Sequence, residues 1–146
     1  MRAEIKKASK KDVEKALPIL RGKQGSSEFG IDPKRVIEDA IDHAEQCWVG
    51  RIDGQIVCIW GTERTGTLLS DEVYLWVLTT KLVDEHPFLF LRYSREFVKQ
   101  LCERNHRVWG LVNPRYTVSI QWLKWLGFDV GLNAKGVMIF EKVRGH

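Results

Sequence analysis

The chain has 146 residues, of which 44% are hydrophobic and 29% are charged, and its formal net charge is +4. This length suits a single domain, residues 1–146, with a core of its own, and the composition is ordinary for a soluble globular protein. No apolar run reaches the ~20 residues of a membrane-spanning helix, and the N-terminus lacks the apolar segment of a secretory signal. We therefore expect no membrane span and a cytoplasmic location.

The cysteines and histidines form no metal-binding or hydrolase pattern in the sequence. Cys47, Cys58 and Cys102 are scattered and lack the close pairing of a zinc site. The four histidines show neither a Ser/His/Asp arrangement nor metal-ligand spacing. We expect reduced thiols, as in cytosolic proteins, and no bound metal.

The N-terminal third predicts one strand and two helices. A strand is expected from Ala3 to Ala8, and Ser9 and Asp12 then resemble a capping box that starts a helix, which Pro18 ends. A second helix begins at Asp32-Pro33. Its apolar face has helical spacing and comprises Val36, Ile37, Ala40, Ile41 and Ala44.

A hairpin and a loop are expected next. The apolar segments Cys47–Ile52 and Gln55–Trp60 flank Asp53-Gly54, a dipeptide that favours a two-residue hairpin turn. The following segment, Thr62–Ser70, is polar and contains glycine, which predicts a loop.

Strands and helices then alternate. An apolar strand, Glu72–Thr79, leads through Thr80–His86 into a helix of roughly Pro87–Arg104, and a second strand covers Arg107–Asn113.

A short helix and a hairpin complete the chain. Thr117 or Ser119 can cap the helix, and Gly127 can end it. The segments Asp129–Leu132 and Val137–Val143 predict the hairpin. The helix should direct three side chains inward, those of Val118, Trp122 and Trp125.

This order of elements predicts an α/β protein of the mixed α+β type. Two N-terminal helices, a long meander and a crossover connection imply a central mixed, mostly antiparallel, twisted sheet with helices on both faces. We expect three large side chains to be mostly buried, those of Trp76, Trp109 and Ile41.

The stretch from Glu72 to Phe128 resembles the acyl-CoA-binding core of the GCN5-related N-acetyltransferases (GNAT). The shared order is strand, loop, helix, strand, helix and a closing Gly-Phe, here Gly127-Phe128. The resemblance implies a GNAT-like fold and acetyl-CoA-dependent N-acyl transfer. The partners implied are acyl-CoA and an amine acceptor, which can be a protein.

Two shorter segments, Ser70–Val73 and Gln121–Gly127, are similar to small acetyltransferase-like proteins of short-tailed bacteriophages. This similarity implies an alternative function, that of a catalytically inactive protein that keeps the fold and acts in virion assembly or host interaction. Its location would then be the host cytoplasm or the virion. The acceptor and the oligomeric state are not indicated by the sequence.

The resemblance also implies where acetyl-CoA binds. Main-chain groups of Leu78, Thr79 and Thr80 fall where the family pairs its strand end with the pantetheine arm. The pyrophosphate loop of the family falls on Lys81–Phe88, where Lys81 and His86 can supply positive charge. The signature arginine and glycines of that loop are replaced by Val83, Glu85 and Pro87.

These replacements leave two interpretations of the loop open. Pro87 has no amide proton to donate to a phosphate, and Glu85 repels one, although the start of the following helix still offers free amides and a favourable dipole. The segment is therefore either a degenerate pyrophosphate loop or a plain connection between a strand and a helix.

The acid that protonates the leaving thiolate is a tyrosine in many family members, and that position is Leu123 here. Tyr116 or Ser119 can replace it from the entrance of the helix, although Tyr116 is equally well explained as a packed surface aromatic. Asn113 falls where the family places a polar residue near the cofactor. Its other interpretation is a turn-forming residue before Pro114.

A general base is needed to take a proton from the incoming ammonium. Glu72 and Tyr74 lie beside the expected acyl site and share one face of their strand, because side chains alternate with period two. Glu63 and Asp71 lie on the flanking loop. The simpler interpretation of these carboxylates is that they are solvated residues at strand ends.

Six tryptophans together with basic residues can indicate nucleic-acid binding. Four of the tryptophans fall in predicted strands and two on the short helix, and the basic residues are spread along the chain. This placement is typical of core and rim positions and argues against nucleic acid as a partner.

Overall fold

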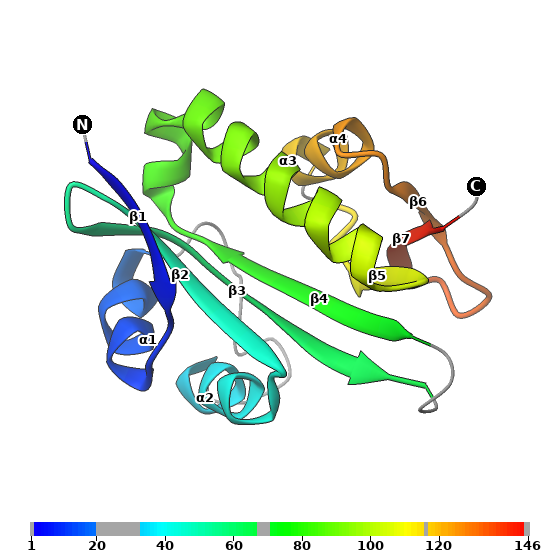
Figure 1. Cartoon of the computed structure of the whole chain (residues 1–146), viewed down its shortest axis with the longest axis horizontal. Coiled ribbons are helices and arrows are strands. Elements are labelled where there is room, and N and C mark those ends of the chain that lie inside the picture. The colour runs from blue at the N-terminus through cyan, green and yellow to red at the C-terminus, as the bar shows by residue number, and fades with distance from the viewer. Residues whose placement is uncertain (1, 20–32, 67–70, 116, 145–146) are drawn as a thin grey trace. The chain divides into compact units, whose positions relative to one another are not determined.

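The computed structural model describes residues 2–19, 33–66, 71–115 and 117–144 (Figure 1). The helices and strands are, in chain order, β1 (Ala3–Lys7), α1 (Lys10–Ala16), the 3₁₀ helix η1 (Leu17–Ile19), α2 (Pro33–His43), β2 (Gln46–Ile52), β3 (Gln55–Thr65), β4 (Glu72–Thr79), the 3₁₀ helix η3 (Lys81–Glu85), α3 (Pro87–Arg104), β5 (Arg107–Leu111), α4 (Thr117–Trp125), β6 (Asp129–Leu132) and β7 (Met138–Val143).

The strands form one seven-stranded sheet in the order β1-β2-β3-β4-β5-β7-β6. Only β4 and β5 are recorded as a parallel pair, and the other described registers are antiparallel. The predicted class, a mixed and mostly antiparallel sheet with helices, is therefore confirmed. The chain divides into two compact units, residues 1–63 with 77–87 and residues 64–76 with 88–146, and each is described by itself.

The first unit is built on the meander β1-β2-β3. Val49 pairs with Ile59 across β2 and β3, and both side chains are at most 1% exposed. The turn residues Asp53 and Gly54 have φ values of 50° and 79°. Positive φ at both central residues is what a type I′ turn requires, so the predicted hairpin is confirmed together with its turn.

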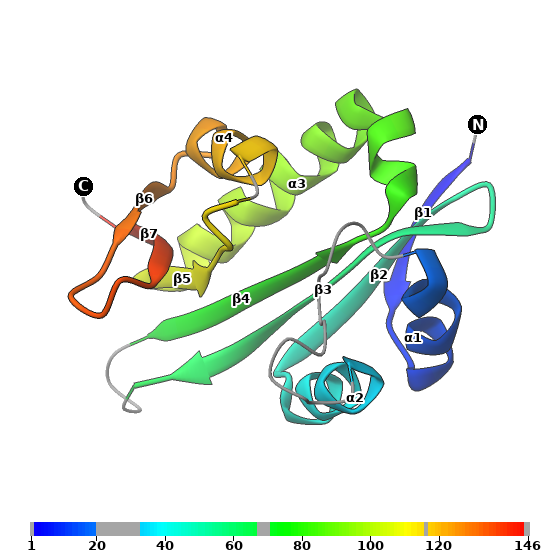
Figure 2. The ribbon, with the colours of Figure 1, turned by 180° about the vertical axis from the view of Figure 1, so that it is seen from behind.

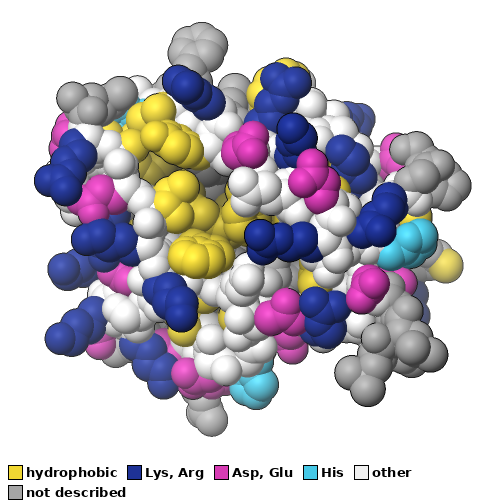
Figure 3. All heavy atoms as spheres, viewed as in Figure 1, with side chains coloured by type: hydrophobic (Ala, Val, Ile, Leu, Met, Phe, Trp, Pro, Cys, Tyr) yellow, Lys and Arg dark blue, Asp and Glu magenta, His cyan; other side chains and the backbone are white. Residues whose placement is uncertain are grey.

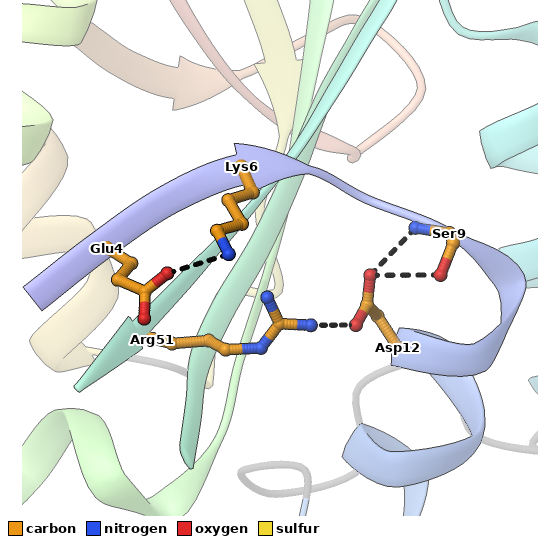
Figure 4. A network of polar contacts seen from close by, with 5 residues as sticks. All are labelled: Glu4, Lys6, Ser9, Asp12 and Arg51. Carbon is orange, nitrogen blue, oxygen red and sulfur yellow. Dashed lines mark hydrogen bonds and ion pairs between the residues drawn. The ribbon is translucent and has the colours of Figure 1, made fainter. Parts of the chain in front are cut away.

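A buried carboxylate anchors the first helix to this meander. Asp12 accepts a hydrogen bond from the Ser9 N–H at 2.8 Å, which is the returning half of the predicted capping box. Arg51 on β2 forms an ion pair with the same carboxylate, while Lys6 and Glu4 pair at 3.0 Å (Figure 4). Because Asp12 is almost fully buried, its charge needs this partner.

The two N-terminal helices lie on the same face of β1–β3 (Figures 1 and 2). Helix α1 ends at Ala16, and a 3₁₀ turn that contains Pro18 follows, as proline predicts. Helix α2 is present as predicted, but Asp32 and the side chains of Val36 and Ile37 lie outside the described residues. Ile41 is only partly exposed.

The loop predicted for Thr62–Ser70 is wrong in its first part. Thr62 pairs with Gln46 and is buried, and β3 continues to Thr65. Polar residues can occupy a strand where cross-strand pairing satisfies their main-chain groups. A prediction based on polarity alone therefore ended this strand too early. Residues 67–70, which include Ser70, lie outside the described residues.

The second unit is built on β5, β6 and β7, with α3 and α4 beside them (Figures 1 and 2). Strand β5 pairs with β7 from Arg107↔Val143 to Leu111↔Ile139, and its predicted end at Asn113 is two residues too late. The core of this unit is apolar and includes Val73, Leu75, Val108, Leu123, Leu126, Phe128 and Phe140.

Gly110 marks the tightest packing in this unit. A Cβ atom at this position would lie 2.2 Å from the Phe140 ring and 2.4 Å from the Leu75 carbonyl oxygen. Any side chain would therefore collide with both a core ring and the main chain of β4. Glycine is required at position 110 by this close approach.

One prediction about tryptophan packing is wrong. Trp125 is 54% exposed, whereas Leu123 on α4 and Leu126 just after it are buried. Trp122 is half-buried, and the side chain of Val118 lies outside the described residues.

Trp76 and Trp109 are only partly exposed. The alternating positions of their strands, such as Leu75 and Val108, are buried more fully.

Candidate functional site

The polar groups of Thr80, at the end of β4, are hydrogen-bonded within the first unit. Its N–H donates to the Val57 carbonyl at 2.9 Å, and its hydroxyl donates to the Ile56 carbonyl at 2.8 Å. Thr80 is fully buried and Thr79 is nearly so, while Leu78 is half-buried. Since successive residues of a strand direct their main-chain groups to opposite edges, Thr79 directs its own groups away from β3.

The segment after Thr80 forms the 3₁₀ helix η3, which the sequence did not predict. The Leu82 N–H donates to the Thr80 hydroxyl at 3.3 Å, and the Val83 N–H donates to the Thr80 carbonyl at 3.2 Å. The His86 N–H donates to the Val83 carbonyl at 3.3 Å. Three amides of the supposed pyrophosphate loop are therefore already bonded within the segment.

Some features of this segment still fit a phosphate group. Lys81 is exposed and His86 is half-buried, and α3 begins directly after them at Pro87. An 18-residue helix has a positive end at its first turn and amides there that lack helical partners. Glu85 is also exposed and opposes an anion.

In the second unit, Glu72 and Tyr74 point to one face of β4, and both contact β5. The Glu72 carboxylate lies 3.7 Å from the Arg107 guanidinium, which also binds Glu141 at 2.8 Å. The Tyr74 ring packs edge-on against Trp109 at 4.9 Å between centroids. Glu72 is thus a half-buried, ion-paired group, not the solvated carboxylate of the simpler interpretation.

The parallel pairing of β4 with β5 is short. It runs from Glu72↔Arg107 to Tyr74↔Trp109, whereas β5 keeps its pairing with β7 as far as Leu111. Trp109 is also fixed by a hydrogen bond from its Nε1 to the Thr65 hydroxyl, at 3.0 Å. The β4–β5 register therefore covers only the first three residues of β4.

The predicted acid candidates differ in what surrounds them. Leu123 is only 4% exposed and belongs to the core, so it cannot face a substrate as it stands. Ser119 is half-buried on α4, and Tyr116 lies outside the described residues. Asn113 is exposed and its side-chain oxygen accepts the Arg115 N–H at 2.9 Å, a geometry that supports its turn-forming interpretation.

A second feature was missed by sequence reasoning, a pocket of about 760 Å³ in the second unit. It lies between the C-terminal half of α3, the end of α4 and the end of β7, and we call it the basic pocket. The one sequence signal for it is the helical spacing of Arg95, Lys99 and Cys102. Its lining comprises Arg95, Val98, Lys99, Cys102, Glu103, Trp125, Leu126, Gly127, Lys142, Val143 and Arg144.

Within the described ranges, no three His, Cys, Asp or Glu side chains come together as a metal site. The same ranges contain no helix of sufficient length and apolarity to cross a membrane.

No family model and no curated protein matches this sequence. Solved structures do match. An N-acetyltransferase from Staphylococcus aureus Mu50 is 12% identical, with 98% of this chain and 99% of that chain covered and a TM-score of 0.71. The PaiA N-acetyltransferase from Thermoplasma acidophilum, solved in complex with coenzyme A, is 15% identical, with 98% and 99% covered and a TM-score of 0.69.

A third match is the GNAT domain of S. lividans PAT, which is 16% identical, with 97% of this chain and 90% of that chain covered and a TM-score of 0.71. These identities show a shared fold alone. The fold of this chain is that of the GNAT N-acetyltransferases, as the sequence predicted.

Proposed function

We propose that the chain is an acetyl-CoA-dependent N-acyltransferase of GNAT type, with a degenerate pyrophosphate loop and an amine, of a small molecule or a protein, as acceptor. The observation that carries this proposal is the fold, which matches N-acetyltransferases over 98% of the chain. One of these structures holds coenzyme A, which supports an acyl-CoA as the donor. Fold alone does not imply function, so the assignment depends on the tests below.

The proposed donor site uses groups on both sides of Thr80. Main-chain groups of Thr79, which point away from β3, pair with the pantetheine arm as an added strand would, and Leu78 and Thr80 flank that contact. Lys81, His86 and the first turn of α3 face the phosphates, in place of a loop of free amides.

The proposed reaction is direct attack of the amine on the thioester. The amine nitrogen forms a bond to the acetyl carbon, the carbon–sulfur bond breaks, and CoA leaves as a thiolate. Glu72, directly or through water with Tyr74, takes the proton that the ammonium must lose. The thiolate takes a proton from Tyr116 or from solvent.

Titration calorimetry with CoA and with acetyl-CoA tests donor binding. We expect saturable binding of both and an acetylated product with at least one member of a broad amine panel. Tyr116→Phe should then lower turnover, whereas Tyr93→Phe, which changes an exposed tyrosine on α3, should not. Absence of CoA binding at millimolar concentration would reject the enzyme proposal.

A second candidate is a catalytically inactive GNAT-fold protein of phage type that acts in virion assembly or host interaction. It is favoured by the amides that η3 already uses and by the buried Leu123 where a tyrosine acid is usual. No CoA binding, no acetylation and a stable complex with a virion or host protein would support it.

A further inference from the structure

The basic pocket collects positive charge from three elements. Arg95 and Lys99 come from α3, and Lys142 and Arg144 come from β7 and the residue after it. One carboxylate, that of Glu103, lines the same pocket. Elsewhere, on the face drawn in Figure 3, Lys and Arg side chains are interspersed with Asp and Glu.

These four cations are not neutralised by neighbouring carboxylates. The Arg144 guanidinium donates to the Glu103 main-chain carbonyl at 2.9 Å, so it is oriented by a neutral group. Among the described residues, no carboxylate lies within ion-pair distance of Arg95, Lys99 or Lys142. The pocket therefore has a positive charge that an anionic ligand can neutralise.

An aromatic surface adjoins this charge. Trp125 is 54% exposed although it follows two turns of a helix whose other face is buried, and Arg95 lies over its ring at 5.6 Å. The pocket also has apolar walls, Val98 and Leu126, which are both buried. An exposed indole with a stacked guanidinium is a platform on which a flat heterocycle can stack.

Gly127 leaves room for one of the cations. Its φ is +96°, and a Cβ atom there would lie 3.1 Å from the Lys142 ammonium nitrogen. The glycine that ends α4 thus also permits the Lys142 side chain to occupy its present position. Charge, an aromatic platform and space are brought together by residues far apart in the sequence.

We propose that the basic pocket binds a nucleoside phosphate, with the base against Trp125 and the phosphates among Lys99, Lys142 and Arg144. Its volume, about 760 Å³, falls within the 300–1,000 Å³ or so that is usual for small-ligand pockets. A polyphosphate alone would leave the exposed indole unused, and an uncharged aromatic molecule would leave the four cations unused. This inference does not depend on the acyltransferase proposal.

Titration calorimetry of the full chain with ATP, adenosine and inorganic tripolyphosphate tests the proposal. We expect ATP to bind more tightly than either fragment and to weaken as salt is added, because the phosphate contacts are electrostatic. Trp125→Ala should weaken ATP binding about tenfold, the usual range for losing one base–aromatic stack. Lys99→Gln, at an exposed position, should also weaken it.

Two matched variants separate pocket effects from general ones. Tyr93→Ala removes an exposed aromatic on α3, and Lys124→Gln removes the charge that precedes Trp125 on α4. Neither residue lines the pocket. Both should bind ATP as the wild type does. Circular dichroism of each variant checks that it is folded.

Several outcomes would overturn the proposal. These are no ATP binding at millimolar concentration, tripolyphosphate binding as tightly as ATP, or equal losses in the Lys124→Gln and Lys99→Gln variants. An acidic peptide that displaces ATP and binds more tightly would also overturn it. CoA contains an adenine nucleotide, so its binding to the wild type and to Trp125→Ala is measured as well. If Trp125→Ala lowers the affinities for CoA and ATP equally, the pocket is the CoA site, and the proposal of a separate nucleotide site is overturned.

Discussion

The Thr80–His86 segment and the basic pocket are two parts of the described chain for which we propose an anionic ligand, and they differ in how their polar groups are used. In the segment, Thr80 and the amides of Leu82, Val83 and His86 are bonded within the chain. In the pocket, four cations face one carboxylate and a solvent-exposed indole. The segment lies where the sequence predicted phosphate binding, whereas the pocket has the cations that carry no carboxylate partner.

This difference shows that position in a fold and capacity to bind are separate properties. A shared fold places a strand end and a helix start at equivalent positions, but the local sequence decides whether the amides there remain available to a ligand. Here the amides of η3 are hydrogen-bonded within the segment itself. Mutations test whether groups that already have partners in the chain also bind or activate a substrate.

The largest effect is expected at Glu72. If this carboxylate is the general base, Glu72→Gln should lower kcat by about 10²–10⁴-fold with little change in the free energy of unfolding. The measurement is the acetylation rate as a function of pH, in which the loss of a base also removes the acidic limb of the profile.

Glu141→Gln is the matched control, because Glu141 binds the same Arg107 guanidinium but lies on β7. It should leave kcat nearly unchanged. Equal losses in both variants would mean that the ion-pair cluster acts through Arg107 and that Glu72 is not the base.

The next effect concerns stability at Gly110. Gly110→Ala should lower the free energy of unfolding by about 3 kcal/mol or more, because the new methyl meets the Phe140 ring and the Leu75 carbonyl at distances no real contact allows. Gly131→Ala is the control, since a Cβ there meets nothing within 4 Å, and should change stability by less than about 0.5 kcal/mol. Urea unfolding of both variants measures the difference, and equal stabilities would contradict the β4–β5–β7 packing.

Much of the fold could be predicted because local signals determine it. Asp53-Gly54 fixes the hairpin, Pro87 begins a helix that ends at Arg104, and Gly127 with φ +96° ends another. The length of β3 depended instead on its pairing with β2, which polarity along the chain does not report. The exposure of Trp125 at the end of α4 was likewise set by tertiary packing.

The candidate site was less predictable for a physical reason. Whether an amide in Thr80–His86 is available depends on 3₁₀ hydrogen bonds that no residue type there demands. The basic pocket joins α3 to β7 across more than forty residues, as in Arg144 and Glu103, and only the folded chain brings them together. Helical spacing could have indicated the α3 part alone.

A moderate effect is expected at Thr80, the first residue of the Thr80–His86 segment. Thr80→Val keeps the shape but removes the hydroxyl that donates to Ile56, so the free energy of unfolding should fall by about 1–2 kcal/mol. CoA affinity should not change if the donor meets main-chain groups only. A loss of CoA affinity larger than the loss of stability would show that the hydroxyl itself binds the donor.

The smallest effect separates two thiols, one in the core of β3 and one in the basic pocket. Burial raises the pKa of Cys58 from 9.0 to about 12. Burial also raises the pKa of Cys102, and the nearby Lys142 and Arg144 offset only part of that rise. Because Cys102 is half-buried and Cys58 is buried, dithionitrobenzoate at pH 8 should modify Cys102 in the folded chain and leave Cys58 intact until unfolding.

The same pKa difference has a definite sign for stability. Between about pH 9 and 12 the unfolded chain has released the Cys58 proton while the folded chain keeps it, so the unfolded state binds fewer protons and stability falls as the pH rises. Cys58→Ala should make this decline shallower than it is in the wild type. Bound ATP should slow modification of Cys102 and not that of Cys47, whose thiol does not line the pocket. Equal protection of both thiols would mean that ATP acts through overall stability and does not bind specifically in the basic pocket.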